Sequence, residues 1–229
     1  IRTTVEQARG RVPVIAGAGA NSTSAAIAGS QVAAEAGADA LLHVTPYYNK
    51  PPPDGLVAHF EALARATELP IVAYNVPGRT GCNMLPDTVA RIARIEGVVA
   101  IKEASGSVTQ GQQVMAACPD DFVLLSGDDP IAMALTAMGG RGVISVTSNV
   151  CPAKMARMIA LTREGRLPEA RALHYELQPL MEALFITTNP IPVKAALAAM
   201  GHGANELRLP LSPLAGEPLE RLTAELRRQ

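Results

Sequence analysis

The chain has 229 residues, 48% of them hydrophobic, and its 20 lysines and arginines nearly balance 21 aspartates and glutamates. This composition is typical of a globular protein with a well-buried core, and a net charge of −1 argues against nucleic acid or an anionic membrane as the natural partner. Three dispersed cysteines (Cys82, Cys118 and Cys151) suggest neither a disulfide framework nor a zinc site, and no apolar stretch is long enough to span a bilayer. We therefore expect a cytoplasmic protein that acts on a small metabolite.

Short apolar runs rich in Val, Ile and Leu recur along the chain. They cover residues 12–19, 40–46, 70–77, 98–104, 122–129 and 142–149. Continuous apolar runs are typical of strands that are covered on both faces, as in a parallel sheet. Helical patterns lie between several of these runs, at 24–37, 54–67 and 85–97, and some of them end at glycine. The sequence thus predicts a repeating βα architecture.

The region after the last apolar run is helical throughout. Residues 152–164 complete the last βα unit, and three further helical patterns follow at 167–185, 191–201 and 217–228. The opening residues, "IRTTVEQARGRVP", read as the end of a helix. We therefore divide the chain into a (β/α) barrel portion, residues 1–164, and an appended C-terminal helical region, residues 165–229.

Polar residues collect at the C-terminal ends of the predicted strands, where barrel enzymes place their active sites. This pattern favours an α/β fold of the (β/α)8, or TIM barrel, type. The alternative, a doubly wound open sheet, lacks its GxGxxG signature, because "GAGAN" after the first run has no third glycine. Only six of eight strands are readable, so at about 30 residues per unit about 60 residues would be missing from the front. We therefore expect an N-terminally truncated barrel.

Lys102 directly follows the apolar residues 98–101, in what reads as a buried strand. Inside a dry barrel, burial lowers the pKa of a lysine, and its neutral amine can attack a ketone to form a Schiff base. The alternative is an ion pair, for which Glu103 is a poor candidate because adjacent strand residues point to opposite faces. With polar residues at nearly every strand end, we favour the nucleophile.

The segment "YNVPGRTG", residues 74–81, supplies two helpers. The Tyr74 hydroxyl can relay protons while a carbinolamine loses water, although a tyrosine here can also be a simple core aromatic. The planar guanidinium of Arg79, in a loop pinned by Pro77 and two glycines, suits a substrate carboxylate, although a lone arginine is often only solvated. The histidines are scattered without metal-ligand spacing and are interpreted as structural or surface residues: His43, His59, His174 and His202.

Together these segments resemble a known family. "VTPYYNKP", "YNVPGRTG", "IKEASG", "LLSGDD", "GVISVTSN" and "NPIPVK", in this order and spacing, look like the dihydrodipicolinate synthase (4-hydroxy-tetrahydrodipicolinate synthase) family of pyruvate-dependent class I aldolases. The resemblance covers essentially the whole chain, and "GRTG" separates it from the related N-acetylneuraminate lyases. It implies a lyase that condenses pyruvate with L-aspartate 4-semialdehyde to 4-hydroxy-tetrahydrodipicolinate, the first committed step of lysine and diaminopimelate biosynthesis. A related aldolase for a sugar acid and an inactive truncated paralogue remain as alternatives.

The resemblance also implies roles for individual residues. Lys102 would form the Schiff base with pyruvate, Tyr74 would relay protons, and Arg79 would bind the carboxylate of aspartate semialdehyde. No metal or organic cofactor is implied, because the lysine imine is itself the electron sink.

Further residues match positions that contact pyruvate or a second subunit in the family. Gly127 and Ile144 correspond to backbone and apolar positions around bound pyruvate. Tyr48 corresponds to a tyrosine that reaches across a subunit interface and completes the proton relay of its neighbour. The resemblance therefore implies self-association into a homodimer or homotetramer.

Two departures from the family pattern carry expectations of their own. The family's adjacent threonine pair belongs to a strand that this chain lacks, so we expect the chain as it stands to have reduced activity. Asn21 and Tyr47 match an allosteric lysine site, but the glutamate expected four residues after the asparagine is replaced by Ala25. Because a charge-assisted contact is worth about 1.5–3 kcal/mol, we expect weak or absent lysine inhibition.

Overall fold

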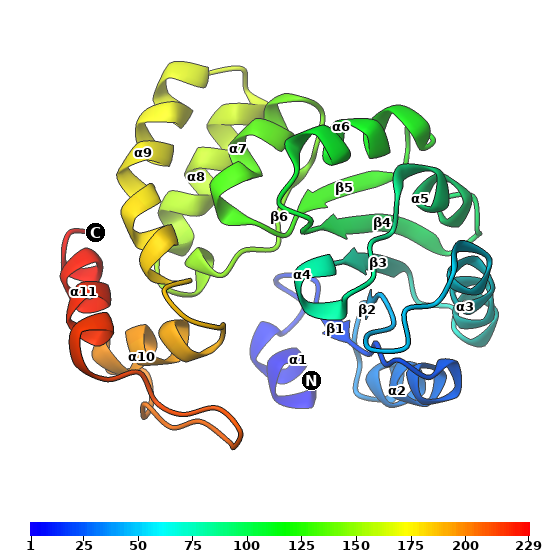
Figure 1. The fold of residues 1–229 in the computed structure, drawn as a ribbon, viewed down its shortest axis with the longest axis horizontal. Helices are drawn as coiled ribbons and strands as arrows, with labels where there is room; N and C mark the ends of the chain where they lie inside the picture. Colours follow the sequence, from blue (N-terminus) through cyan, green and yellow to red (C-terminus); the bar gives the residue numbers. More distant parts are fainter. The chain divides into compact units, whose positions relative to one another are not determined.

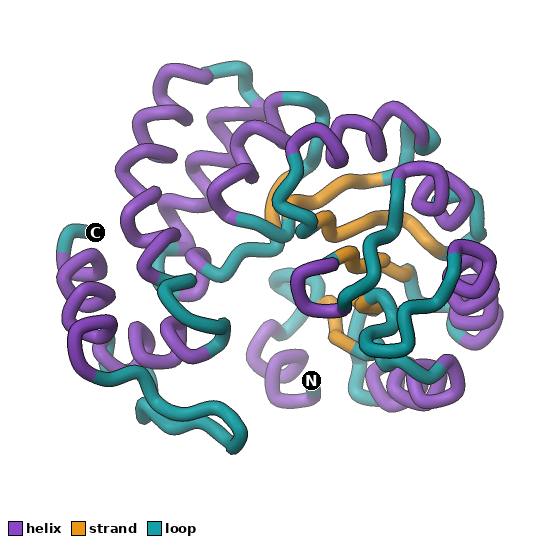
Figure 2. The backbone as a smooth tube through the Cα atoms, viewed as in Figure 1, coloured by secondary structure: helices purple, strands orange, loops and turns teal.

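The computed structural model describes residues 1–229, which form two compact units. The first unit comprises residues 1–127 and 138–141, and the second comprises residues 128–137 and 142–229. Figure 2 shows strands and helices alternating along the first unit, whereas the second is mostly helical. The first unit contains most of the residues that the sequence singles out.

A parallel sheet organises the first unit. Its strands follow one another in chain order, and every neighbouring pair among them is parallel: β1 (Ile15–Gly17), β2 (Ala40–Val44), β3 (Ile71–Asn75), β4 (Val98–Glu103) and β5 (Val123–Ser126). The crossovers that run along the sheet in Figure 1 are α2 (Thr23–Glu35), α3 (Pro53–Ala66), α5 (Pro86–Ile92) and α6 (Val108–Ala117). The predicted βα repeat is confirmed in this unit.

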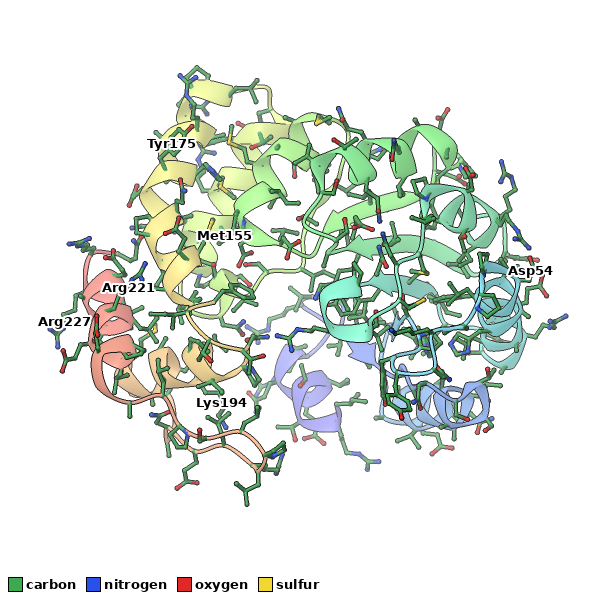
Figure 3. All side chains as sticks on the ribbon, in the orientation of Figure 1. Asp54, Met155, Tyr175, Lys194, Arg221 and Arg227 are labelled. Carbon is green, nitrogen blue, oxygen red and sulfur yellow. The ribbon has the colours of Figure 1, made fainter.

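The crossover helix α3 illustrates why these segments fold as they do. Its apolar residues Leu56, Phe60 and Leu63 recur at helical spacing and are fully or almost fully buried. Pro53 occupies the first turn, where its missing N–H costs no hydrogen bond. On the exposed side, Asp54 accepts a hydrogen bond from Arg91 Nη2 of α5 at 2.9 Å; Figure 3 labels this aspartate. An exposed pair of this kind adds little stability, so burial of the apolar stripe dominates.

The pairing of β3 with β4 contains a bulge. Ile71 pairs with Val98 and Val72 pairs with Ala100, so Val99 is an extra residue in β4. Val99 is 44% exposed, although the apolar run to which it belongs is predicted to be buried. Beyond the bulge, Tyr74 pairs with Lys102 and Asn75 pairs with Glu103.

The last predicted strand is much shorter than expected. Residues 142–149 are predicted as a strand, but β6 covers only Gly142–Val143, and Thr147–Asn149 form a short 3-10 helix, η1. The physical reason is the buried carboxylate of Asp129. Its Oδ2 accepts hydrogen bonds from the backbone N–H groups of Val146 and Thr147 and from the Thr147 hydroxyl, at 3.1, 2.8 and 2.7 Å. Backbone donors used in this way are not available to a strand.

One short helix at the start of the chain was expected, and two others lie outside the predicted patterns. The helix expected at the start is present as α1 (Arg2–Ala8). Residues 77–80, predicted as a loop, form one helical turn, α4 (Pro77–Thr80). In the second unit, α7 (Asp129–Ala137) begins within the strand predicted over 122–129.

Four predicted helices complete the second unit: α8 (Pro152–Arg163), α9 (Leu167–Ala183), α10 (Ile191–Ala199) and α11 (Gly216–Arg227). Met155, labelled in Figure 3, packs with Met158, Leu177 and Met181 where α8 meets α9. Lys154 Nζ donates to Glu176 Oε1 at 2.6 Å and to the backbone oxygen of Gln229 at 2.9 Å, which links α8, α9 and the end of the chain. None of the helices combines the length and apolar character that crossing a membrane requires.

Candidate active site

Lys102 and Tyr74 lie opposite each other on neighbouring strands. Both side chains are half-buried, so Lys102 is less buried than the sequence predicts. The Lys102 Nζ lies 4.2 Å from the centre of the Tyr74 ring, above its face. Because the face of an aromatic ring carries negative charge density, this arrangement stabilises positive charge on the nitrogen, whether as an ammonium or as an iminium.

Gly127 packs closely beside this pair. It follows β5, and its backbone N–H donates to the Glu103 carbonyl oxygen at 2.7 Å. A Cβ atom at residue 127 would lie 2.5 Å from Ala104 Cβ, 3.1 Å from Lys102 Cε and 3.2 Å from Lys102 Cγ. Any side chain here would therefore displace its neighbours, including the lysine stem. The structure thus brings together three predicted site residues: Tyr74 on β3, Lys102 on β4 and Gly127 directly after β5.

Arg79 is exposed on α4, the helical turn that directly follows β3. The turn is closed by the buried Thr80. Its hydroxyl oxygen lies 3.2 Å from the Val76 carbonyl oxygen and 2.9 Å from the Cys82 carbonyl oxygen, and can donate to either. Gly81 ends the turn with a φ of 70°, a left-handed conformation that favours glycine. The arginine is therefore carried by a short, internally bonded loop at the carboxyl end of β3.

Tyr48 lies in the loop after β2 and is 90% exposed. Its φ of 74° is unusual for a residue with a bulky side chain. The backbone N–H of Tyr48 donates to the Thr80 carbonyl oxygen at 3.2 Å, which ties this loop to the one that carries Arg79. The structure thus brings the Tyr48 and Arg79 loops together while the tyrosine side chain points into solvent.

A hydrogen-bonded cluster on the other side of the β3–β4 pair was not predicted. The Asn75 side chain is fully buried, and its Nδ2 donates to Glu103 Oε2 at 2.9 Å and to Asn83 Oδ1 at 2.8 Å. Its Oδ1 accepts from the Met84 N–H at 2.9 Å. The other carboxylate oxygen of Glu103, Oε1, accepts from the Ser105 N–H at 2.7 Å. The sequence feature that could have indicated this cluster is that a polar residue directly follows both Tyr74 and Lys102.

The residues matched to an allosteric site also lie together in the first unit. Asn21 Nδ2 donates to the Tyr47 carbonyl oxygen at 3.2 Å, and Asn49 Nδ2 donates to the Asn21 carbonyl oxygen at 2.8 Å. Tyr47 is 43% exposed, and Ala25 is exposed on α2. Ile144 follows β6 and is half-buried within the second unit.

Two histidines that look scattered in the sequence lie near enough in the structure for the charge of one to act on the other. His43 Nε2 lies 3.1 Å from the Ser30 hydroxyl and His59 Nδ1 lies 2.9 Å from the Thr23 hydroxyl, and both imidazoles are buried. Burial, with a smaller contribution from the charge of His59, lowers the pKa of His43 to about 4. Because the unfolded chain then binds the proton more tightly than the folded one, the free energy of unfolding falls as the pH drops from about 6.5 to about 4.

Comparisons with known proteins agree with this geometry. The family model described as the dihydrodipicolinate synthetase family matches residues 1–229. The 4-hydroxy-tetrahydrodipicolinate synthase of Maridesulfovibrio salexigens is 51% identical over 228 residues, which cover 99% of this chain and 78% of that protein.

Two solved structures show the same fold. The dihydrodipicolinate synthase of Thermotoga maritima superposes with a TM-score of 0.96 at 47% identity, and that of Acinetobacter baumannii, in complex with pyruvate, with a TM-score of 0.97 at 43% identity. Each comparison covers 99% of this chain and 78% of the other. The predicted α/β barrel class is thereby confirmed, and the chain belongs to the dihydrodipicolinate synthetase family.

Proposed function

We propose that this protein condenses pyruvate with L-aspartate 4-semialdehyde to form 4-hydroxy-tetrahydrodipicolinate, with Lys102 as the nucleophile. The observation that carries the proposal is the pairing of Lys102 with Tyr74 across β3 and β4, with Nζ above the ring and the side-chain-free Gly127 alongside. This arrangement offers an amine and a phenol to a small keto acid, beside a glycine whose lack of a side chain leaves the lysine stem undisplaced. The similar A. baumannii enzyme, solved with pyruvate, supports a keto acid as the first substrate.

The first half of the reaction activates pyruvate. The neutral Lys102 amine adds to the keto carbon, and the resulting carbinolamine loses water to give an iminium ion. Loss of a proton from the methyl carbon then produces an enamine, whose nitrogen has taken up the electron pair. The Tyr74 hydroxyl is placed to carry protons in both steps, and its ring stabilises the iminium charge. No metal or organic cofactor is needed for this chemistry.

The second half joins the two substrates. The enamine carbon attacks the aldehyde carbon of aspartate semialdehyde, and the aldehyde oxygen takes up a proton to become the hydroxyl group. The substrate amino group then attacks the re-formed iminium carbon, which closes the ring and releases Lys102 as an amine. One water molecule is lost overall. Arg79, exposed on its closed loop, binds the carboxylate of the semialdehyde through its planar guanidinium.

The proposal includes assembly and regulation. Tyr48 is 90% exposed and has a strained backbone, which suits a residue that contacts a second copy of the chain. We therefore propose that it lies at the interface of a homodimer or homotetramer. The proposed location of this assembly is the cytoplasm. Lysine inhibition is weak, because Ala25 offers no carboxylate to a ligand held near Asn21 and Tyr47.

Borohydride trapping tests the proposed nucleophile. The protein is incubated with pyruvate, reduced, digested and mapped by mass spectrometry. We expect a reduced pyruvate adduct on Lys102 and none on Lys50, Lys154 or Lys194. Lys102→Arg, which keeps the charge but not the nucleophile, should abolish the adduct. A folded parent without an adduct, or an adduct on another lysine, would refute the Schiff-base proposal.

The second substrate is tested separately. Arg79→Ala should retain the pyruvate adduct but raise KM for aspartate semialdehyde about tenfold or more, because a charge-assisted contact is lost. The neighbouring Asp87, which is exposed on α5, provides a matched control as Asp87→Ala. Equal KM values for Arg79→Ala and the parent would assign the carboxylate to another residue.

A further inference from the structure

We infer that Asn75 and Glu103 are positioning residues that hold the Arg79 loop in place for the second substrate. The inference rests on the proposed function and concerns residues that do not touch the reacting atoms. Its basis is a hydrogen-bonded cluster that runs from the buried Asn75 and Glu103 to the half-buried Gln110 and the exposed Asn83.

The strand register separates these two residues from the chemistry. Tyr74 pairs with Lys102, and the next pair along the strands is Asn75 with Glu103. Since successive strand residues point to opposite faces, the second pair lies behind the first. Both side chains are buried, with exposures of 0% for Asn75 and 1% for Glu103. A carboxylate at this depth is costly unless it is hydrogen-bonded, and each of its oxygens accepts one bond.

Asn75 connects Glu103 to the far end of the Arg79 loop. One amide hydrogen bonds Glu103 and the other bonds Asn83, while the amide oxygen accepts from the Met84 N–H. The loop thus leaves β3 directly after Asn75 and is bound to the same side chain when it returns at residues 83 and 84. Because both ends of the loop are attached to one asparagine, its conformation depends on that asparagine.

A second amide extends the cluster to α6. Asn83 Nδ2 donates to Gln110 Oε1 and Gln110 Nε2 donates to Asn83 Oδ1, both at 2.9 Å. Gln110 is itself fixed at the start of α6, where its N–H donates to the Ser107 hydroxyl at 3.1 Å. The cluster therefore runs from Glu103, next to the proposed nucleophile, to α6, which binds the end of the Arg79 loop through Gln110.

The donors and acceptors allow a sharp substitution test. In Glu103→Gln, the new NH2 group faces either the Ser105 N–H or the Asn75 NH2 group. If Asn75 turns to offer its oxygen, its own NH2 group then faces the Met84 N–H. Each of these orientations places two donors together, which leaves buried groups unsatisfied. In Asn75→Asp, two carboxylates face each other instead.

The double variant Asn75→Asp/Glu103→Gln exchanges the two roles. The amide of residue 103 donates to the carboxylate of residue 75, and the Met84 and Ser105 bonds are kept. The Asn83 and Gln110 amides turn together, so that Asn83 Nδ2 donates to the carboxylate of residue 75 and the reciprocal pair of amide bonds survives, while the long 3.4 Å bond from Gln110 Nε2 to the Met84 carbonyl oxygen is lost. The charge of the cluster is unchanged. The exchange should therefore restore the loop that each single substitution disturbs.

The experiment measures borohydride trapping at Lys102 and KM for each substrate in the parent, both single variants and the double variant. We expect each single substitution to raise KM for aspartate semialdehyde about tenfold, with the rate of pyruvate adduct formation changed less than about threefold. The double variant should return to within about threefold of the parent. Gln110→Ala, at the accessible end of the cluster, should shift KM in the same direction by a smaller factor even if the buried variants fold poorly.

The outcomes separate this inference from the function on which it rests. A parent without an adduct at Lys102 refutes the proposed function, and the inference falls with it. An active parent whose variants lose both substrates equally, or whose double variant shows no recovery, refutes the positioning role alone. A purely structural role would lower the unfolding temperature without this division between the two substrates.

Discussion

The closest packing in the candidate site predicts a strong effect of Gly127→Ala. The added methyl would lie 2.5 Å from Ala104 Cβ, whereas carbon atoms in contact normally lie about 3.5–4 Å apart. Relief thus requires movements of about 1 Å, and the Lys102 stem, at 3.1 and 3.2 Å, lies in the path. Overpacking of this kind costs about 1–3 kcal/mol, and a misplacement of about 1 Å can slow a reaction about a hundredfold.

Two measurements separate the effect on stability from the effect on chemistry. Thermal unfolding should show a lower midpoint, by about 2–4 °C for each kcal/mol in a chain of this length. Borohydride trapping with pyruvate should show adduct formation at Lys102 slowed by about tenfold to a hundredfold. Gly17→Ala is the matched control, because a Cβ atom there meets nothing within 4 Å.

A compensating variant sharpens the test. Adding Ala104→Gly to Gly127→Ala removes the 2.5 Å contact but leaves both contacts with Lys102. Stability should therefore recover, while adduct formation should recover only in part. Trapping at the parent rate in folded Gly127→Ala, or an equal loss in Gly17→Ala, would refute the reasoning from packing.

Three further predictions follow from single side chains. His43→Gln should remove a loss of about 3 kcal/mol in unfolding free energy between about pH 6.5 and 4; urea unfolding at several pH values measures it, and an unchanged pH dependence would contradict it. Tyr74→Phe, which keeps the ring over Lys102, should slow trapping of the pyruvate adduct at least about a hundredfold; a parent-like rate would exclude the proton relay. Asp129→Ala should lower the unfolding free energy by about 3 kcal/mol, because backbone donors at Val146 and Thr147 lose their acceptor; an unchanged urea midpoint would disagree with this account.

The sequence pattern predicts the elements of the fold well where apolar side chains decide them. The runs around Leu41, Ile71 and Ile101 become strands with fully buried residues, and the stripe of α3 becomes a helix. The pattern fails where a polar side chain decides. The bonds that Asp129 accepts from Val146 and Thr147 shorten β6, and a carboxylate 17 residues away in the chain leaves no mark on the local apolar pattern.

The candidate site is predictable only in part for a similar reason. Lys102, Tyr74 and Arg79 stand out in the sequence because polar residues at strand ends are conspicuous, and their roles stay predictions. The Asn75–Glu103 contact is not predictable in this way, because it depends on which residues pair across two strands. The electrostatic influence of His59 on His43 likewise depends on how a strand and a helix pack.

The extra residue in β4 works as a spacer that selects which face of the sheet each side chain occupies. If Val99 paired as an ordinary residue of the ladder, counting from the Ile71–Val98 pair would place Tyr74 opposite Ile101 and Asn75 opposite Lys102. The amine would then face an amide rather than a phenol, and Glu103 would lose the residue that it holds. Closing the bulge with every residue kept would thus exchange the reactive and supporting layers of the site without altering a single polar residue, whereas deleting Val99 would leave the Tyr74–Lys102 and Asn75–Glu103 pairs in place.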